Sequence, residues 1–315
     1  MIERIDFTDC RRILTKAYNG ANGKKIAVEY NGTQYMLKFP PSAQNKPTDL
    51  SYSNSCFSEH IACSIFNMLG INAQKTLLGE FNINGKTKIV CACSDFTADG
   101  KILYDFCSIK NTIIDSEHNG NGTELSDIIE TIEKQQFVDP NILTEHFWNV
   151  FVIDAFLGNF DRHNGNWGFL YDERTHTAEI SPVYDCGSCL LPQADEKTMR
   201  LVLSNVDEMN ARVFNFPTSA IKSNGKKINY YDFLNGGEFE ECNKAIERIA
   251  PKIDIAKISG FIESIPYLSE LQKAFYTQYI NSRYEKIILP VYEQILDENI
   301  AEKQDFSEDQ GMKMQ

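Results

Sequence analysis

The first hundred residues contain short runs of β-branched, aromatic and aliphatic residues, separated by residues that favour turns. Two such runs, residues 26–30 and 34–39, flank Asn31-Gly32, which is a strong signal for a β-hairpin. Pro40-Pro41 ends the second run, because proline cannot donate a hydrogen bond to a neighbouring strand. Residues 88–93 predict a further strand. This part of the chain therefore predicts a small β-rich unit.

A helical pattern lies between the second and third of these strands. Within residues 58–70, Ile61, Ile65, Phe66 and Leu69 recur at helical spacing, and the glycine that ends the run suits a helix terminus. The pattern therefore predicts one amphipathic helix within the β-rich unit.

The rest of the chain is mostly helical in pattern. Asp139 is a helix-capping residue, and Pro140 after it suits the first helical position. The helix that they open is apolar and should end at Gly158. Residues 167–171 and 178–184 then predict a short hairpin.

A last apolar stripe, residues 268–288, predicts a long helix that Pro290 interrupts. The order of the elements predicts an α+β fold with a β-rich N-lobe and a helical C-lobe. We place the N-lobe at residues 1–95, the C-lobe at 96–300 and a flexible, polar tail at 301–315.

The composition is that of a globular protein. Of 315 residues, 42% are hydrophobic and 24% are charged, which excludes a mainly disordered or low-complexity chain. Lysine and arginine number 31 against 44 acidic residues, so the formal net charge is −13. Because such a surface repels phosphate backbones, we expect no nucleic-acid partner.

The sequence also indicates the cellular compartment in which the protein is expected. No apolar stretch reaches the roughly 18 residues that a membrane-spanning helix needs, so we expect no integral membrane association. The first residues lack the basic and apolar regions of a signal peptide. Nine cysteines are scattered along the chain without a dense framework, which indicates reduced thiols in a cytoplasm.

Residues suited to phosphoryl transfer surround the predicted C-lobe hairpin. Asp161 and Asn166 precede it, and Asp185 follows its second strand. Because a hairpin brings its two ends together, we expect Asn166 and Asp185 to be neighbours. Two hard oxygen ligands suit Mg²⁺, which takes its other ligands from water and phosphates. Asp161 is then placed to accept a proton from a hydroxyl group.

The β-rich lobe supplies a cation for nucleotide phosphates. Lys38 lies near the end of the second strand, on the face opposite Leu37 and Phe39. Glu59, in the first turn of the predicted helix, is expected to pair with Lys38 and hold it toward the phosphates. A glycine-containing turn upstream is expected to cover the phosphates with its backbone N–H groups, and its residues are Gly20, Ala21, Asn22, Gly23 and Lys24.

These motifs resemble those of the HipA-like serine/threonine kinases. The resemblance is carried by residues 158–166, by Leu170 and by residues 182–185, and it extends from about residue 19 to residue 296. It implies a two-lobed atypical protein-kinase-like fold, with ATP between the lobes and Asp161 as the catalytic base. It also implies that Asn166 and Asp185 hold Mg²⁺. The implied ATP contacts come from the side chains of Lys38 and His163 and from the backbone of Ala92, Cys93 and Ser94.

We therefore predict an ATP- and Mg²⁺-dependent kinase that phosphorylates serine or threonine hydroxyls of a protein substrate and also phosphorylates itself. A phosphoinositide or lipid kinase is an alternative, because residues 161–166 also resemble the loop of those enzymes. A pseudokinase that binds nucleotide as a scaffold is a second alternative. A third is a zinc site formed by Cys91, Cys93, Cys186 and Cys189.

The resemblance also bears on location and partners. Within the family the chain is most similar to a bacterial cell-translocating kinase. We therefore expect it in the bacterial cytoplasm, with translocation into a host cell as the alternative. HipA toxins extend further at the N-terminus, where part of their partner-binding surface lies, so we regard an antitoxin partner as doubtful.

Overall fold

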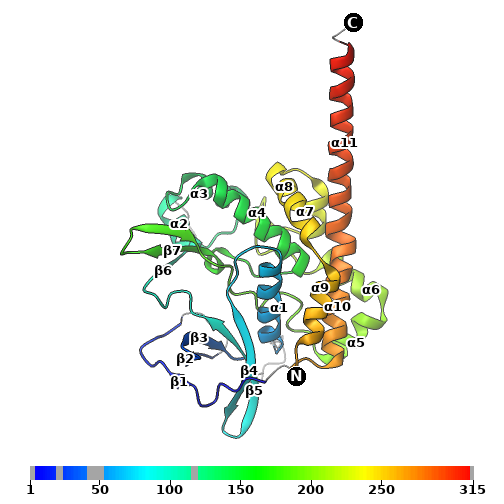
Figure 1. Ribbon diagram of the computed structural model, residues 1–315. Helices are drawn as coiled ribbons and strands as arrows, with labels where there is room; N and C mark the ends of the chain where they lie inside the picture. The colour runs from blue at the N-terminus through cyan, green and yellow to red at the C-terminus, as the bar shows by residue number, and fades with distance from the viewer. Residues whose placement is uncertain (1–3, 19–23, 41–52, 115–119, 313–315) are drawn as a thin grey trace.

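The computed structural model describes residues 4–18, 24–40, 53–114 and 120–312, with side chains described as far as residue 301 (Figure 1). Strands dominate the first part of the chain and helices dominate the remainder. The predicted α+β organisation, a β-rich lobe followed by a helical lobe, is confirmed.

The N-lobe sheet is antiparallel, and within the described residues its strand order is β1-β2-β3-β5-β4. Its strands are β1 (Arg11–Arg12), β2 (Lys25–Tyr30), β3 (Thr33–Lys38), β4 (Thr76–Ile83) and β5 (Lys86–Ser94). One face carries a small apolar cluster of Phe7, Val28, Leu37, Phe39, Phe81, Val90 and Ala92. The other face meets the helix α1 (Ser55–Met68), so Lys38 lies between the sheet and that helix.

The β2–β3 hairpin is the predicted one. Asn31 (φ 49°) and Gly32 (φ 74°) both adopt the left-handed conformation that a two-residue hairpin turn requires. The sequence pattern did not predict β4, whose apolar run is interrupted by Gly79. Glycine is needed there, because a Cβ would lie 2.4 Å from the ring of Phe7.

Helix α1 begins at Ser55, before the predicted start at residue 58, and ends at Met68. Gly70 follows with φ 82°, as expected of a glycine after a helix terminus. Because of the earlier start, Glu59 lies in the second turn of α1 and not in the first. Its side chain is only 1% exposed.

The C-lobe begins with a three-stranded antiparallel sheet in the order β6-β7-β8. The predicted hairpin is confirmed as β7 and β8, and β6 adds to its edge. Two helices, α2 and α3, lead from β6 to the long helix α4. The bounds are β6 (Ile102–Asp105), α2 (Phe106–Ile113), α3 (Leu125–Lys134), α4 (Pro140–Leu157), β7 (Gly168–Asp172) and β8 (Thr177–Ile180).

Helix α4 has the ends that the sequence predicts. The side chain of Asp139 accepts a hydrogen bond from the N–H of Asn141, and Pro140 occupies the first helical position. Gly158 ends the helix with φ 66°. A side chain could not replace its hydrogen, because a Cβ would lie 2.4 Å from the Tyr279 hydroxyl. The chain therefore leaves α4 in a fixed direction, toward the loop that carries Asp161.

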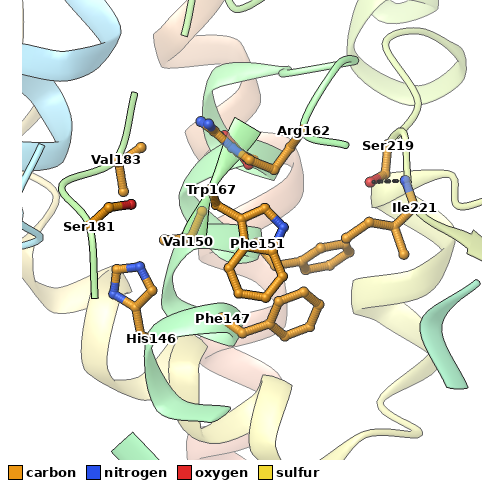
Figure 2. Close-up of a pocket in the computed structure, with 11 residues that line it drawn as sticks. His146, Phe147, Val150, Phe151, Arg162, Trp167, Ser181, Val183, Ser219 and Ile221 are labelled. Atoms are coloured by element: carbon orange, nitrogen blue, oxygen red, sulfur yellow. Dashed lines mark hydrogen bonds and ion pairs between the residues drawn. The ribbon is translucent and has the colours of Figure 1, made fainter. Parts of the chain in front are cut away.

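One side of α4 lines a cavity (Figure 2). Its apolar lining comes from Phe147, Val150 and Phe151 of α4 and from Trp167, Val183 and Ile221 across the cavity. Its polar lining is His146, Asp154, Arg162, Ser181 and Ser219.

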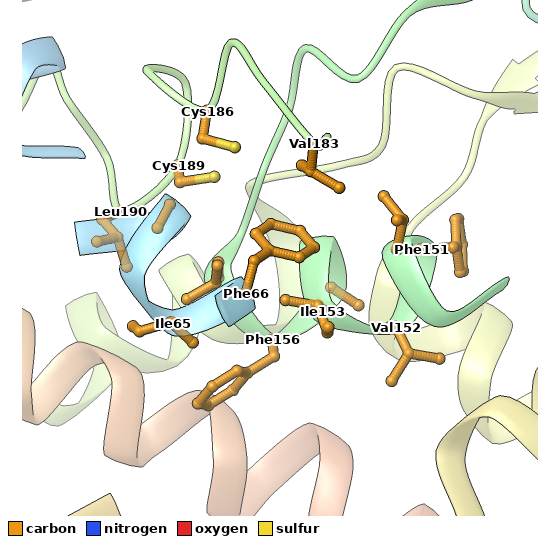
Figure 3. Close-up of a cluster of buried hydrophobic side chains, with 14 of the residues drawn as sticks. Ile65, Phe66, Phe151, Val152, Ile153, Phe156, Val183, Cys186, Cys189 and Leu190 are labelled. Carbon is orange, nitrogen blue, oxygen red and sulfur yellow. The ribbon is translucent and has the colours of Figure 1, made fainter. Parts of the chain in front are cut away.

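Another side of α4 packs against α1. Ile153 and Phe156 of α4 meet Ile65 and Phe66 of α1 in the larger of the two apolar clusters (Figure 3). Burying each side chain of this size contributes roughly 1.5–3 kcal/mol. This cluster therefore fastens α1, and with it the N-lobe sheet, to the helical lobe.

The remaining elements complete the C-lobe. They are η1 (Asn164–Asn166), α5 (Glu196–Ser204), α6 (Val206–Asn210), η2 (Ala211–Asn215), β9 (Lys222–Ser223), β10 (Lys226–Lys227), α7 (Tyr230–Gly236), α8 (Glu240–Ile249), η3 (Ala250–Lys252), α9 (Ile255–Ser264), α10 (Glu270–Arg283), η4 (Tyr284–Ile288) and α11 (Leu289–Met312). None of the described helices combines the length and the apolar character needed to cross a membrane.

The expectation that Pro290 interrupts the last helix is wrong. The π-helical turn η4 connects α10 directly to α11, and the N–H of Leu289 bonds to Tyr284 O within it. Pro290 then lies in the first turn of α11, directly after this π-helical turn, and the helix continues past it. The predicted tail, residues 301–315, is helical as far as Met312, and Figure 1 shows this end of α11 projecting beyond the rest of the lobe.

Candidate active site

The predicted ion pair between Lys38 and Glu59 is present, and Asp185 joins it. The Nζ atom of Lys38 lies 2.9 Å from Glu59 Oε2 and 2.8 Å from Asp185 Oδ1. The Glu59 side chain is buried, whereas 47% of the Asp185 side chain is exposed. One ammonium group therefore links a strand, a helix and the segment after β8.

These charges act strongly on one another. Burial alone would lower the pKa of Lys38, but the charges of Asp185 and Glu59 outweigh it and raise this pKa well above its ordinary value. The positive charge of Lys38 lowers the pKa of Asp185 to about 2. Burial raises the pKa of Glu59, although Lys38 opposes this effect. Lys38 and Asp185 are thus both charged at neutral pH.

Asp185 has an unusual backbone conformation. Its φ of 55° lies in the left-handed region, which a non-glycine residue adopts at a cost of roughly 1 kcal/mol or more. Gly187 follows closely, and a Cβ there would lie 3.3 Å from Glu59 Oε2. The backbone after β8 is thus bent and closely packed where Asp185 meets Lys38.

A second lysine, Lys25, also faces this group, and sequence reasoning did not assign it a role. Lys25 is the cross-strand partner of Lys38 in the β2–β3 hairpin. Burial lowers its pKa, the charge of Lys38 lowers it further, and Asp185 and Glu59 oppose the shift. The sequence did contain a signal for the position of Lys25, namely the Asn31-Gly32 turn. A two-residue turn at this place sets the strand register, and this register pairs Lys25 with Lys38.

The side chain of Lys24 lies away from Lys38. Its Nζ atom lies 5.5 Å from the centre of the Phe39 ring, and Phe39 belongs to the apolar cluster on the sheet face opposite Lys38. Because successive residues of a strand alternate between faces, Lys25 and not Lys24 lies beside Lys38. The other residues of the predicted glycine turn, Gly20, Ala21, Asn22 and Gly23, lie outside the described residues.

The segment that leads to this turn is anchored where β5 ends. The hydroxyl of Tyr18 donates to Asp95 Oδ2 at 2.8 Å, and Lys16 forms an ion pair with the same carboxylate. Asp95 is the first residue after β5. These contacts hold residues 16–18 beside the connection between the lobes.

The backbone of Ala92, Cys93 and Ser94, where an adenine contact is predicted, is hydrogen-bonded within the protein. Ala92 and Cys93 lie within β5 between β3 and β4, and all three strands are paired there. The N–H of Ser94 donates to Lys75 O, and its carbonyl accepts from Gln74 Nε2. Since β4 was not predicted, sequence reasoning could not anticipate that these groups are engaged.

The loop after α4 is organised by a buried ion pair. Arg162 Nε lies 2.9 Å from Asp154 Oδ2, and both side chains are 5% exposed or less. Arg162 Nη1 also donates to Asn166 O at 3.1 Å and to Tyr184 O at 2.6 Å. Arg162 therefore ties together the two ends of the hairpin that carry Asn166 and Asp185.

The predicted base, Asp161, lies on the same loop. Asn166 Nδ2 donates to Asp161 O at 2.7 Å, and the Tyr230 hydroxyl donates to Asn159 O at 2.6 Å. Burial raises the pKa of Asp161, His163 lowers it, and Asp185 raises it. The charge of Asp185 therefore makes Asp161 harder to ionise.

His163 is the exposed residue of this loop. Its Nδ1 atom accepts a hydrogen bond from the N–H of Gly165 at 3.0 Å. This bond fixes the ring and leaves Nε2 as the nitrogen that can donate to a bound group.

The oxygen donors present fit Mg²⁺. Asn166 uses its amide nitrogen toward Asp161, so its Oδ1 atom is left to accept, and Asp185 is a charged carboxylate. Among the described residues, no group of three or more His, Cys, Asp and Glu side chains could hold a metal ion. The cysteine zinc alternative is therefore not supported, and Cys186 instead accepts from Arg162 Nη2 at 3.3 Å.

Comparisons with known proteins identify a family and relatives of this chain. A family model described as the HipA-like C-terminal domain matches residues 17–254. The serine/threonine-protein kinase CtkA of Helicobacter pylori (strain J99) is 47% identical over 301 residues, which are 95% of this chain and 91% of that protein.

Solved structures show the same relationship. The crystal structure of an H. pylori proinflammatory kinase CtkA matches with a TM-score of 0.88 at 47% identity, covering 94% of this chain and 98% of that chain. HipA from Shewanella oneidensis MR-1, solved with HipB and operator DNA, matches with a TM-score of 0.54 at 15% identity, covering 93% and 76% of the two chains. The second match shows a shared fold alone. The predicted resemblance is confirmed, and the chain belongs to the HipA-like family, with the serine/threonine-protein kinase CtkA among its relatives.

Proposed function

We propose that this protein is a serine/threonine protein kinase that transfers the γ-phosphate of ATP to protein hydroxyls in a Mg²⁺-dependent reaction. The observation that carries the proposal is the group of Lys38, Glu59 and Asp185, held together across the two lobes. Phosphoryl transfer depends mainly on positioning and on neutralising charge, and this group supplies both functions.

In this proposal the two lobes hold ATP from opposite sides. Lys38, oriented by Glu59, contacts the phosphates, and Lys25 adds a second positive charge from the neighbouring strand. His163 Nε2 contacts the phosphates from the C-lobe. The adenine packs against the connection after β5, where the rings of Phe96 and Tyr184 lie 5.7 Å apart.

Asn166 and Asp185 would hold Mg²⁺, which neutralises charge on the transferring phosphate when bound. Asp161 accepts the proton of the acceptor hydroxyl. Its raised pKa makes its carboxylate a better proton acceptor than that of an ordinary aspartate. Arg162 keeps Asp161, Asn166 and the segment before Asp185 in register.

The test is Asp161→Asn, which preserves shape and removes the base. We expect ATP binding to persist and phosphate transfer to a protein substrate to fall by about 10²–10⁴-fold. Mass spectrometry of the wild type after incubation with ATP would also reveal self-phosphorylation. Wild-type transfer rates in Asp161→Asn would overturn the assignment of the base. Phosphate transfer to inositol lipid but not to protein would favour the lipid-kinase alternative, and unchanged γ-phosphate would favour the scaffold.

A further inference from the structure

A basic hairpin lies beside the proposed catalytic base, in a chain whose net charge is −13. It is formed by β9 and β10, and its lysines, Lys222, Lys226 and Lys227, are all exposed. Throughout the described part of the chain, none of the three has an ion-pair partner. The name basic hairpin refers below to β9 and β10 with these three lysines.

Two like charges lie directly opposite each other in the basic hairpin, which is unfavourable for the stability of the isolated protein. Lys222 and Lys227 are direct cross-strand partners, so their side chains share one face and repel each other. The nearby Glu124 does not relieve this repulsion through an ion pair, because its carboxylate accepts the N–H of Gly225 at 3.2 and 3.3 Å. Two unpaired like charges on one face are suited to a negatively charged partner.

The hairpin is attached to the loop that carries Asp161. Tyr230, shortly after β10, donates to Asn159 O at 2.6 Å, and Ile228 O accepts from the N–H of Ser219 at 2.8 Å. Ser219 and Arg162 line the same cavity behind the loop (Figure 2). Lys227 is near enough for its charge to act on Asp161. The cations are thus held at a fixed place relative to the proposed base.

An apolar surface adjoins the same loop. Phe216 is 42% exposed, and the centre of its ring lies 5.7 Å from that of Phe160, the residue before Asp161. A peptide whose hydroxyl reaches Asp161 would therefore meet the Phe160–Phe216 pair as well as the charges of the basic hairpin.

We propose that the basic hairpin and the Phe160–Phe216 pair select the protein substrate, which carries acidic residues and an apolar residue beside the phosphorylated serine or threonine. This inference rests on the proposed kinase function and specifies its substrate class. The hairpin lysines are not part of the ATP site, because Lys25 and Lys38 supply the phosphate-binding cations from the other lobe.

The experiment measures peptide binding separately from phosphate transfer. Fluorescein-labelled peptides that carry alanine in place of the acceptor serine, flanked by either glutamate or lysine, are titrated with the full chain and followed by anisotropy. We expect the acidic peptide to bind at least 10-fold more tightly than the basic one. The double variant Lys222→Glu/Lys227→Glu should reverse this order.

The control variant is Lys252→Glu/Lys257→Glu, which makes the same change in net charge at two exposed residues of η3 and α9. It should leave the preference unchanged. Thermal melting checks that both variants fold, and Lys222→Gln should not lower the melting temperature, because it removes a like-charge contact. Phe216→Ser should weaken the binding of acidic peptides with an apolar flank and spare those without one.

The two proposals fail in different ways. Equal binding of acidic and basic peptides by the wild type, or an unchanged preference in Lys222→Glu/Lys227→Glu, overturns this inference even if phosphate is transferred. Competition between ATP and the acidic peptide also overturns it, since the lysines would then belong to the nucleotide site. Selective binding of the acidic peptide without any phosphate transfer upholds the inference and contradicts the kinase function.

Discussion

Lys38 Nζ lies 2.8 Å from Asp185 Oδ1, although 147 residues separate the two along the chain. One residue ends a strand of the N-lobe, and the other follows the last strand of the C-lobe hairpin. Their contact joins the two lobes at the proposed nucleotide site. Since Lys38 lowers the pKa of Asp185 to about 2, the contact also keeps Asp185 ionised and ready to bind a cation.

Replacing Lys38 with methionine should disable the site while keeping most of the side-chain volume. Glu59 and Asp185 would then face each other without the cation between them. We expect ATP affinity to fall by about 10-fold or more and phosphate transfer to fall by about 10²-fold or more. Isothermal titration and a radiolabelled transfer assay would measure the two effects. Lys86→Met, at an exposed residue of the same sheet, is the control. Equal losses in both variants would contradict the assignment.

Removing the proposed metal ligands should abolish the effect of Mg²⁺ on nucleotide binding. For the wild type, we expect Mg²⁺ with ATP to raise the melting temperature above the value with ATP and a chelator. Asp185→Ala and Asn166→Ala should each remove this difference, since each removes one of the two oxygen ligands. Asp297→Asn, at an exposed residue of α11, should keep it. A full Mg²⁺ effect in both ligand variants would show that the metal binds elsewhere.

Breaking the buried ion pair of Asp154 and Arg162 should strongly destabilise the fold. Arg162→Met leaves a buried carboxylate without its partner, so we expect the free energy of unfolding to fall by about 3–5 kcal/mol. Asp154→Leu/Arg162→Met should recover part of this loss, because no unpaired charge remains. Denaturant unfolding of the three proteins would measure both values.

The double variant should remain inactive even where it is stable. It lacks the Arg162 hydrogen bonds to Asn166 O and Tyr184 O, which position the two proposed metal ligands. Activity near the wild-type level in a folded double variant would mean that Arg162 has no positioning role.

Two histidines should make the protein less stable in mild acid. Burial lowers the pKa of His60 to about 4, and burial together with Arg162 lowers that of His146 to about 4. Unfolding restores an ordinary pKa of about 6.5, so the unfolded state binds protons that the folded state excludes. The free energy of unfolding should therefore decrease as the pH falls from 6.5 toward 4, by up to about 1.4 kcal/mol per pH unit for each histidine.

Urea unfolding between pH 5 and 6.5 would measure this slope. His60→Gln and His146→Gln should each flatten it, whereas His176→Asn, at an exposed residue, should not. An identical slope in all four proteins would show that these two histidines are protonated equally in the folded and unfolded states.

Sequence alone determined the elements whose signals are local. Asn31 and Gly32 specified a hairpin, and Asp139, Pro140 and Gly158 specified both ends of α4. These predictions succeeded because turn conformation and helix capping depend on a few neighbouring residues. The same local logic placed Lys38 opposite Leu37 and pointed to the loop of Asp161.

The tertiary structure decided which of these residues meet. The contacts of Lys38 with Asp185 and of Arg162 with Tyr184 join separate elements, and only the packing of α1 against α4 and the return of the hairpin bring them within hydrogen-bond distance. Likewise, β4 occupies one edge of β5, and η4 carries the last helix past Pro290. Such contacts depend on burial and pairing between distant segments, which no short stretch of sequence encodes.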